Sequence, residues 1–145
     1  GTDRGDRDRL DFTSFSHQRL YRDAHESDQN ELSYFIARHP EDSSIQVLAR
    51  REQNRIDDRP DEGGRVEILY EDIRGLNFEF LDPNDLRWVD RWSTEQAAGQ
   101  PGRLPTQVKI SLTVAAPNGR SEVTYTTRVN VPIRYSLNHA VYLRR

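Results

Sequence analysis

Two alternating segments joined by a tight turn constrain the fold more than any other feature of the sequence. In residues 104–116, apolar side chains recur at every second position. Pro117-Asn118-Gly119 follows, and Asn-Gly is the strongest short-range signal for a hairpin turn. Residues 121–133 then alternate in the same way, so the sequence predicts an antiparallel hairpin with one apolar face. That face comprises Val108, Ile110, Leu112 and Val114 on the first strand, and Val123, Tyr125, Thr127, Val129 and Val131 on the second.

Further strands are predicted upstream, each bounded by turn or loop residues. They are residues 10–16, 31–39, 45–51, 66–70 and 76–81. The segment 31–39 ends at Pro40 and forms a predicted hairpin with 45–51. Residues 71–75 interrupt the strand pattern between 66–70 and 76–81, and residues 82–85 have the composition of a turn. No segment has the 3.6-residue apolar period of a helix, so we expect a mostly antiparallel β fold with one sheet face in need of a covering element.

The chain has 145 residues, which is the length of one domain. We divide it into a flexible leader (1–9), a globular β-rich domain (10–133) and a C-terminal tail (134–145) that forms a short helix or an added strand. There is no Cys, which excludes disulfide scaffolds, zinc-cysteine clusters and thiol catalysis. There is also no Met, so we expect the natural start to lie upstream. No apolar run approaches the roughly 18 residues of a membrane span.

The charge is unevenly distributed along the chain. The net charge is −3, but residues 103–145 contain seven basic residues and one acid, so that they carry +6 and the rest of the chain −9. Such a split favours contact with a charged partner or with a neighbouring copy of the chain, although outward-facing arginines of an ordinary sheet would produce it too. Aromatic residues are not interleaved with the basic ones as stacking platforms would be, which argues against nucleic-acid binding.

Candidate catalytic and metal-binding groups are weak. His17 and His25 lack the tight spacing of metal ligands, and Asp82, Asn84 and Asp85 lack the rest of a calcium loop. An Asp-Pro turn is the simpler interpretation of the latter. The acid pairs of one charged segment have no apolar pocket to raise a carboxyl pKa. These pairs are Asp57/Asp58 and Asp61/Glu62. We therefore expect no enzymatic activity, no cofactor and no metal.

Trp88 and Trp92 are the most informative side chains of the central region. Two indoles four residues apart are compatible with a sugar-binding platform. They are also compatible with structural packing beneath a loop, because each ring buries on the order of 150–250 Å². The packing role is the interpretation that we prefer from sequence.

An ordered series of these motifs resembles the J-type minor pseudopilins of the bacterial type II secretion system (the GspJ family). The strand VEILYEDI leads into Leu76-Asn-Phe-Glu-Phe-Leu-Asp82, then a turn and Trp88-x-x-x-Trp92. A variable loop precedes Leu104-Pro105, which opens a strand of the form LPxxVKIxLxV, followed by its hairpin partner. The resemblance extends from Leu10 to Pro132.

The resemblance implies a pilin-like α+β fold. In this family a processed, methylated N-terminus continues into a long apolar helix, half in the inner membrane and half covering the sheet. The sequence contains no such helix, so we expect most of it to lie upstream and the present chain to be mainly antiparallel β.

The resemblance also implies an architectural role. Together with the I-type and K-type minor pseudopilins, and with the H-type as a further candidate, the protein would form the tip that primes assembly of the periplasmic pseudopilus. The chain would contact the membrane only through the upstream helix. For the partner contact we expect an exposed apolar sheet face, formed by Val108, Ile110 and Leu112 or by Val123, Tyr125 and Val129.

Two alternatives stay open at this point. One is a minor pilin of a type IV pilus or competence system. The other, from a different class, is a β-rich module that binds carbohydrate through Trp88 and Trp92, or calcium through Asp82, Asn84 and Asp85.

Overall fold

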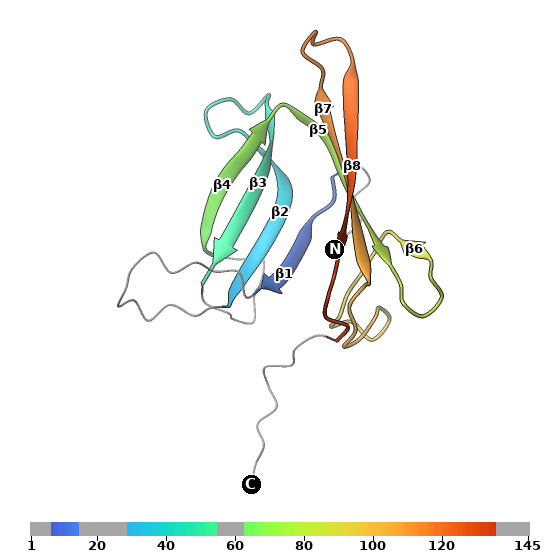
Figure 1. The fold of residues 1–145 in the computed structure, drawn as a ribbon. Coiled ribbons are helices and arrows are strands. Elements are labelled where there is room, and N and C mark those ends of the chain that lie inside the picture. The colour runs from blue at the N-terminus through green and yellow to red at the C-terminus, as the bar shows by residue number, and fades with distance from the viewer. Residues whose placement is uncertain (1–6, 15–28, 55–62, 136–145) are drawn as a thin grey trace.

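The computed structural model describes residues 7–14, 29–54 and 63–135 as two four-stranded antiparallel sheets (Figure 1). The first sheet has the order β1-β2-β3-β4 and the second the order β6-β5-β7-β8. The strands of the first are β1 (Leu10–Ser14), β2 (Asn30–Arg38), β3 (Gln46–Gln53) and β4 (Arg65–Glu71). Those of the second are β5 (Ile73–Leu81), β6 (Trp88–Val89), β7 (Gln107–Ala115) and β8 (Glu122–Asn130).

The antiparallel β part of the expected fold class is confirmed, and its helical part has no counterpart in the described residues. Within those residues, no helix has the length and apolar character of a membrane span. The α component of the predicted α+β class therefore stays a prediction.

Both hairpins predicted from turn chemistry are present. Strands β2 and β3 pair antiparallel through the turn after Pro40, and β7 pairs with β8 along its whole length. In the second turn Gly119 has a φ of 66°, which glycine adopts without steric cost. The Asn118 side-chain oxygen accepts hydrogen bonds from the backbone amides of Arg120 (3.0 Å) and Ser121 (3.2 Å).

The interruption predicted at 71–75 is a sharp bend that carries the chain from one sheet to the other. Asp72 sits between β4 and β5 with a φ of 60°, a left-handed conformation that aspartate tolerates better than most residues. The register of β5 against β7 also shifts between Ile73 and Gly75. Figure 1 shows the chain passing from β4 to β5 at one end of the molecule, between the two layers.

The hydrophobic core lies between the two sheets. Its buried cluster comes from alternate positions of β5 and from the segment after β6, and consists of Leu76, Phe78, Phe80 and Trp92. The first sheet packs against this cluster with Leu10, Tyr34, Ile36 and Leu48. The sequence predicts a sheet face in need of a covering element, and over β5 the first sheet supplies that cover, because the bend at Asp72 places the two sheets face to face.

The sequence places residues 7–9 in a flexible leader, but in the structure Arg7 and Asp8 lie against β5, and Arg9 contacts Asp11 and Ser33 of the first sheet. Arg7 forms a parallel bridge with Leu76, and the Asp8 amide donates a hydrogen bond to the Leu76 carbonyl at 2.9 Å. The Asp8 side chain is buried, and its Oδ2 accepts a hydrogen bond from the Phe78 amide at 2.8 Å. This short segment therefore connects the second sheet to β1 of the first.

Candidate protein-contact surface

One face of the second sheet is apolar across β7 and β8. The register places Val108 opposite Val129, Leu112 opposite Tyr125 and Val114 opposite Val123. Residues directly opposite in an antiparallel pair project from the same face. The two sets that the sequence offered as alternative contact residues therefore form one continuous surface, which we call the β7–β8 apolar face.

The two strands of this face differ in exposure. Val108, Ile110 and Leu112 on β7 are half-buried because they pack against the core cluster. On β8 the exposed fractions are 38% for Val123, 64% for Tyr125 and 49% for Val129. The part of the face that remains available for contact is thus the part on β8.

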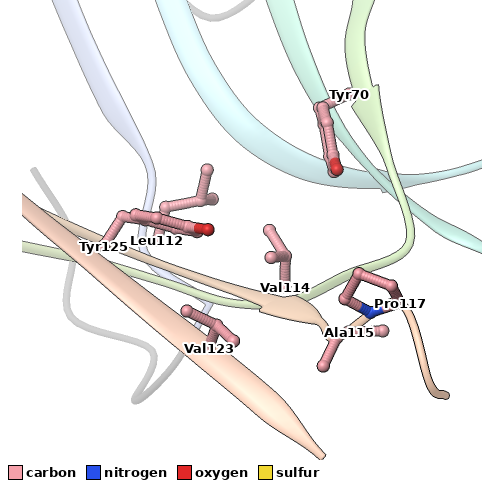
Figure 2. Close-up of a pocket in the computed structure, with 8 residues that line it drawn as sticks. Tyr70, Leu112, Val114, Ala115, Pro117, Val123 and Tyr125 are labelled. Atoms are coloured by element: carbon pink, nitrogen blue, oxygen red, sulfur yellow. The ribbon is translucent and has the colours of Figure 1, made fainter.

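Tyr70 extends this surface from the first sheet. It lies on β4, is 55% exposed, and stands across a pocket of about 440 Å³ from the β7–β8 hairpin (Figure 2). The pocket is lined by Tyr70, Leu112, Val114, Ala115, Ala116, Pro117, Val123 and Tyr125. The sequence does not predict that Tyr70 belongs to this surface, because no local pattern shows that β4 and the β7–β8 hairpin come together. Its aromatic side chain just before the interruption at 71–75 is the one feature that points to it.

The opposite face of the second sheet is polar. Hydroxyl pairs cross between β7 and β8, from Ser111 to Thr126 at 3.1 Å and from Thr113 to Thr124 at 2.8 Å. Further along, Lys109 pairs with Glu79 at 2.5 Å. This polarity difference between the two faces identifies the apolar one as the better candidate for protein contact.

Trp88 and Trp92 do not form a shared platform. The Trp88 ring lies on the polar face, where Lys109 Nζ is 4.9 Å and the Arg128 guanidinium carbon 5.4 Å from the ring centre. Trp92 is only 5% exposed, its ring centre lies 6.3 Å from that of Phe80, and its indole N–H donates to the Arg103 carbonyl at 3.1 Å. The carbohydrate alternative, which needs both indoles on one open surface, has no geometric support.

The Asp82–Asp85 segment is a self-contained turn. The Asp82 carboxylate accepts hydrogen bonds from the Arg103 guanidinium and, at 2.9 Å, from the Asn84 amide. The Asp85 carboxylate accepts from the Arg87 amide at 3.1 Å. The calcium-ligand candidates Asp82 and Asp85 are thus engaged in other bonds, and the structure as described contains no group of three His, Cys, Asp or Glu side chains arranged around a metal site.

Arg103 lowers the pKa of Asp82 below its ordinary value of 3.8, with a further contribution from the Asn84 amide, while burial opposes the shift. Because the folded-state pKa is the lower one, the resulting stability is present above pH 3.8 and is lost as the pH falls through the folded-state pKa. We expect an NMR titration of the Asp82 carboxyl to have its midpoint below 3.8, and Arg103→Gln to raise that midpoint. An unchanged midpoint in the variant would show that Arg103 is not the cause.

The remaining candidates of the sequence analysis lie outside the described residues. These are His17, His25, Asp57, Asp58, Asp61 and Glu62. Of the C-terminal segment, Arg134 and Tyr135 are described: the Arg134 carbonyl accepts from the Leu104 amide at 2.9 Å, and Tyr135 forms a bridge with Arg103.

A two-sheet β domain with an open apolar face is typical of a protein that works through contacts with other proteins. The family model described as type II secretion system (T2SS), protein J, matches residues 1–125. Because the match covers most of the chain, the chain belongs to the type II secretion system protein J family. No curated protein matches it.

Family membership confirms the resemblance drawn from the motif series. It also decides between the two pilin classes, because the matched family is that of the type II secretion system. The family is a structural component of secretion rather than an enzyme family. The match ends at Tyr125, within β8, somewhat earlier than the Pro132 limit expected from the motifs.

Proposed function

We propose that this protein is a minor pseudopilin of the pseudopilus tip, where it assembles with the I-type and K-type subunits, and with the H-type as a further candidate, to prime pseudopilus growth. Its β domain lies in the periplasm, and an upstream methylated helix anchors it in the inner membrane before incorporation. The observation that carries this proposal is the match to the protein J family over residues 1–125.

The β7–β8 apolar face supports a contact role for the domain itself. Val123, Tyr125 and Tyr70 are exposed apolar side chains around one pocket, and an exposed apolar patch on a protein domain usually marks a contact surface. The basic C-terminal third adds electrostatic steering toward an acidic partner. The subunits associate through the upstream helix as well, so contact through the β domain alone is weak.

Sedimentation of the protein mixed with soluble I-type and K-type subunits tests this assembly. We expect association at low ionic strength, weaker association at about 1 M salt, where the Debye length falls to about 3 Å, and stronger association when the upstream helix is restored. If the helix-containing protein associates with neither subunit at either ionic strength, the tip role is wrong.

Tyr70→Ser tests whether the apolar face takes part. Tyrosine is enriched among interface residues whose truncation costs more than roughly 1 kcal/mol, so we expect association to weaken by about tenfold. Leu86→Ser is the matched control, because Leu86 is 73% exposed but lies in the turn after β5, away from the pocket. Equal effects of the two substitutions would exclude a specific role for this face.

A further inference from the structure

Among the residues that the structure describes, strand β8 is an open edge of the second sheet. It stands last in the order β6-β5-β7-β8, and all nine of its residues are exposed. An edge strand of this length presents a row of unpaired backbone donors and acceptors, to which another strand can pair. Its pairing with β7 keeps one register from Glu122 to Asn130 without a bulge, so its two faces alternate regularly.

The sequence of β8 is complementary to itself in the antiparallel direction. In a register centred on Tyr125, Glu122 of one copy stands opposite Arg128 of the second, and Arg128 opposite Glu122. Glu122 and Arg128 are an even number of residues from Thr124 and Thr126 along β8, so all four side chains project from the same face of the sheet. This is the polar face, where the threonine hydroxyls lie. Moving the centre to Thr126 would place Asn130 opposite Glu122 and Thr124 opposite Arg128, which are neutral residues. Moving it to Thr124 would place Thr126 opposite Glu122, and Arg128 would stand opposite Arg120, a like charge just before β8.

We propose that β8 pairs with β8 of a second copy of this chain, in the register centred on Tyr125, to form a twofold-symmetric dimer. Symmetric pairing across a twofold axis makes each contact twice. The two second sheets then form one continuous eight-stranded sheet with the strand order β6-β5-β7-β8 followed by its reverse. This contact uses the strand edge and does not depend on the tip role.

Both faces of the joined sheet continue patterns already present in one copy. On the polar face, Thr124 stands opposite Thr126 of the second copy, which extends the hydroxyl pairs that cross from β7 to β8. On the apolar face, the two Tyr125 side chains meet at the centre. Tyr125 is 64% exposed in one copy, so this contact removes a large apolar side chain from water, and aromatic cross-strand pairs stabilise sheets.

The two charges at the ends of the register are available for pairing. Glu122 forms no ion pair within the described part of the chain. The guanidinium of Arg128 lies over the Trp88 ring, 5.4 Å from its centre. Arg128 likewise forms no ion pair within the described part of the chain. Because Trp88 lies on β6, pairing with Glu122 of the second copy requires the guanidinium to move from this ring to the β8 edge.

The edge strand β4 of the first sheet differs from β8 in this respect. Arg65 and Glu71 stand at its ends and are oppositely charged, but Arg65 is paired with Glu52 and Glu71 with Val47. Glu52 and Val47 are five residues apart on β3 and therefore lie on opposite faces of the sheet. The irregularity between Leu48 and Ala49 causes this change of face, so Arg65 and Glu71 cannot meet across a symmetric pair. Arg65 and Glu67 could meet in a register centred on Val66, but β4 begins at Arg65, so that register would pair only residues 65–67 of each copy.

Charge reversal at Glu122 and Arg128 tests the proposal, because it distinguishes pairing in this register from nonspecific association. We expect sedimentation equilibrium to give a monomer–dimer equilibrium for the unaltered protein. Glu122→Arg places Arg opposite Arg twice and Arg128→Glu places Glu opposite Glu twice. Because like charges directly opposite destabilise a strand pair, each variant should dimerise more weakly, by about tenfold or more. The double variant E122R/R128E restores both pairs and should dimerise again.

Sedimentation of an equimolar mixture of the two single variants is the decisive experiment. When a strand carrying Glu122→Arg pairs with a strand carrying Arg128→Glu, one end of the mixed dimer places the two introduced residues opposite each other, and the other end places the unaltered Arg128 opposite the unaltered Glu122. Both ends then have opposite charges, so the mixture should contain more dimer than either variant alone at the same total concentration.

Both substituted positions are exposed, and circular dichroism of each variant checks that the fold is retained. A monomeric unaltered protein over the whole dilution series would overturn the proposal. Single variants that dimerise as well as the unaltered protein would overturn it too.

Hydrogen exchange supplies a readout that needs no variant. Backbone amides of β8 that point away from β7 should gain protection as the concentration of the unaltered protein rises, while those of β4 should not. Protection that grows on β4 or on the apolar face but not on β8 would show that the copies associate elsewhere.

Discussion

Replacement of Trp92 by alanine should lower the free energy of unfolding by about 3–5 kcal/mol, the usual cost of truncating a large core aromatic residue. The indole is 5% exposed and belongs to the core cluster with Leu76, Phe78 and Phe80. Its removal also deprives the Arg103 carbonyl of its hydrogen bond from the indole N–H. Urea unfolding followed by circular dichroism measures the loss without depending on tryptophan fluorescence.

Trp88→Ala is the matched control for this prediction. Trp88 is half-buried on the polar face, and its ring contacts are with Lys109 and Arg128. Because a cation–π contact at an exposed site contributes about 0.5–1 kcal/mol, we expect the loss of both contacts in Trp88→Ala to cost roughly 1–2 kcal/mol. If the two substitutions destabilised the protein equally, or if Trp92→Ala left its stability unchanged, the assignment of Trp92 to the core would be wrong.

The hairpins could be predicted because their signals are local. The period of two in 104–116 and 121–133, the Asn-Gly turn and the stop at Pro40 each act over a few residues. The same period runs through the predicted strand 76–81, and the structure buries its alternate apolar residues Leu76, Phe78 and Phe80.

The division into two sheets could not be predicted in the same way. It depends on the bend at Asp72, and a left-handed aspartate has no unambiguous sequence signal. The alternation in β3 predicts its buried face only in part: Val47 and Ala49 are apolar and buried, but the next buried position on that face is Arg51. Its burial is compensated by a hydrogen bond to Ser33 at 3.1 Å, a partner on another strand that the sequence does not reveal.

The candidate contact surface was predicted as a set of residues but not as an arrangement. The apolar positions of β7 and β8 follow from their alternation, whereas their difference in exposure depends on where the first sheet stops covering the second. The contribution of Tyr70 depends on the same tertiary packing. Local patterns therefore identified the face, and the packing of the sheets determined which part of it remains open.

Asp8→Ala should destabilise the protein by about 1–3 kcal/mol, the cost of leaving a buried hydrogen-bonding group without its partner. Asp8 is 2% exposed, and its carboxylate accepts the hydrogen bond of the Phe78 amide at 2.8 Å in the centre of β5. Alanine has no side-chain oxygen to accept this bond. Asp8→Asn keeps a side-chain oxygen at the same place, so we expect a smaller loss.

Asp90→Ala provides the matched control, because Asp90 is an exposed aspartate in the segment after β6. Its substitution should change the stability by no more than about 0.5 kcal/mol, as is usual for surface positions. Urea unfolding of the three variants at one pH distinguishes the two accounts of the N-terminal residues. If residues 7–9 only formed a leader, Asp8→Ala would resemble Asp90→Ala. If they connect the second sheet to β1, the loss in Asp8→Ala is several times larger, because it breaks a contact between segments 70 residues apart in the chain.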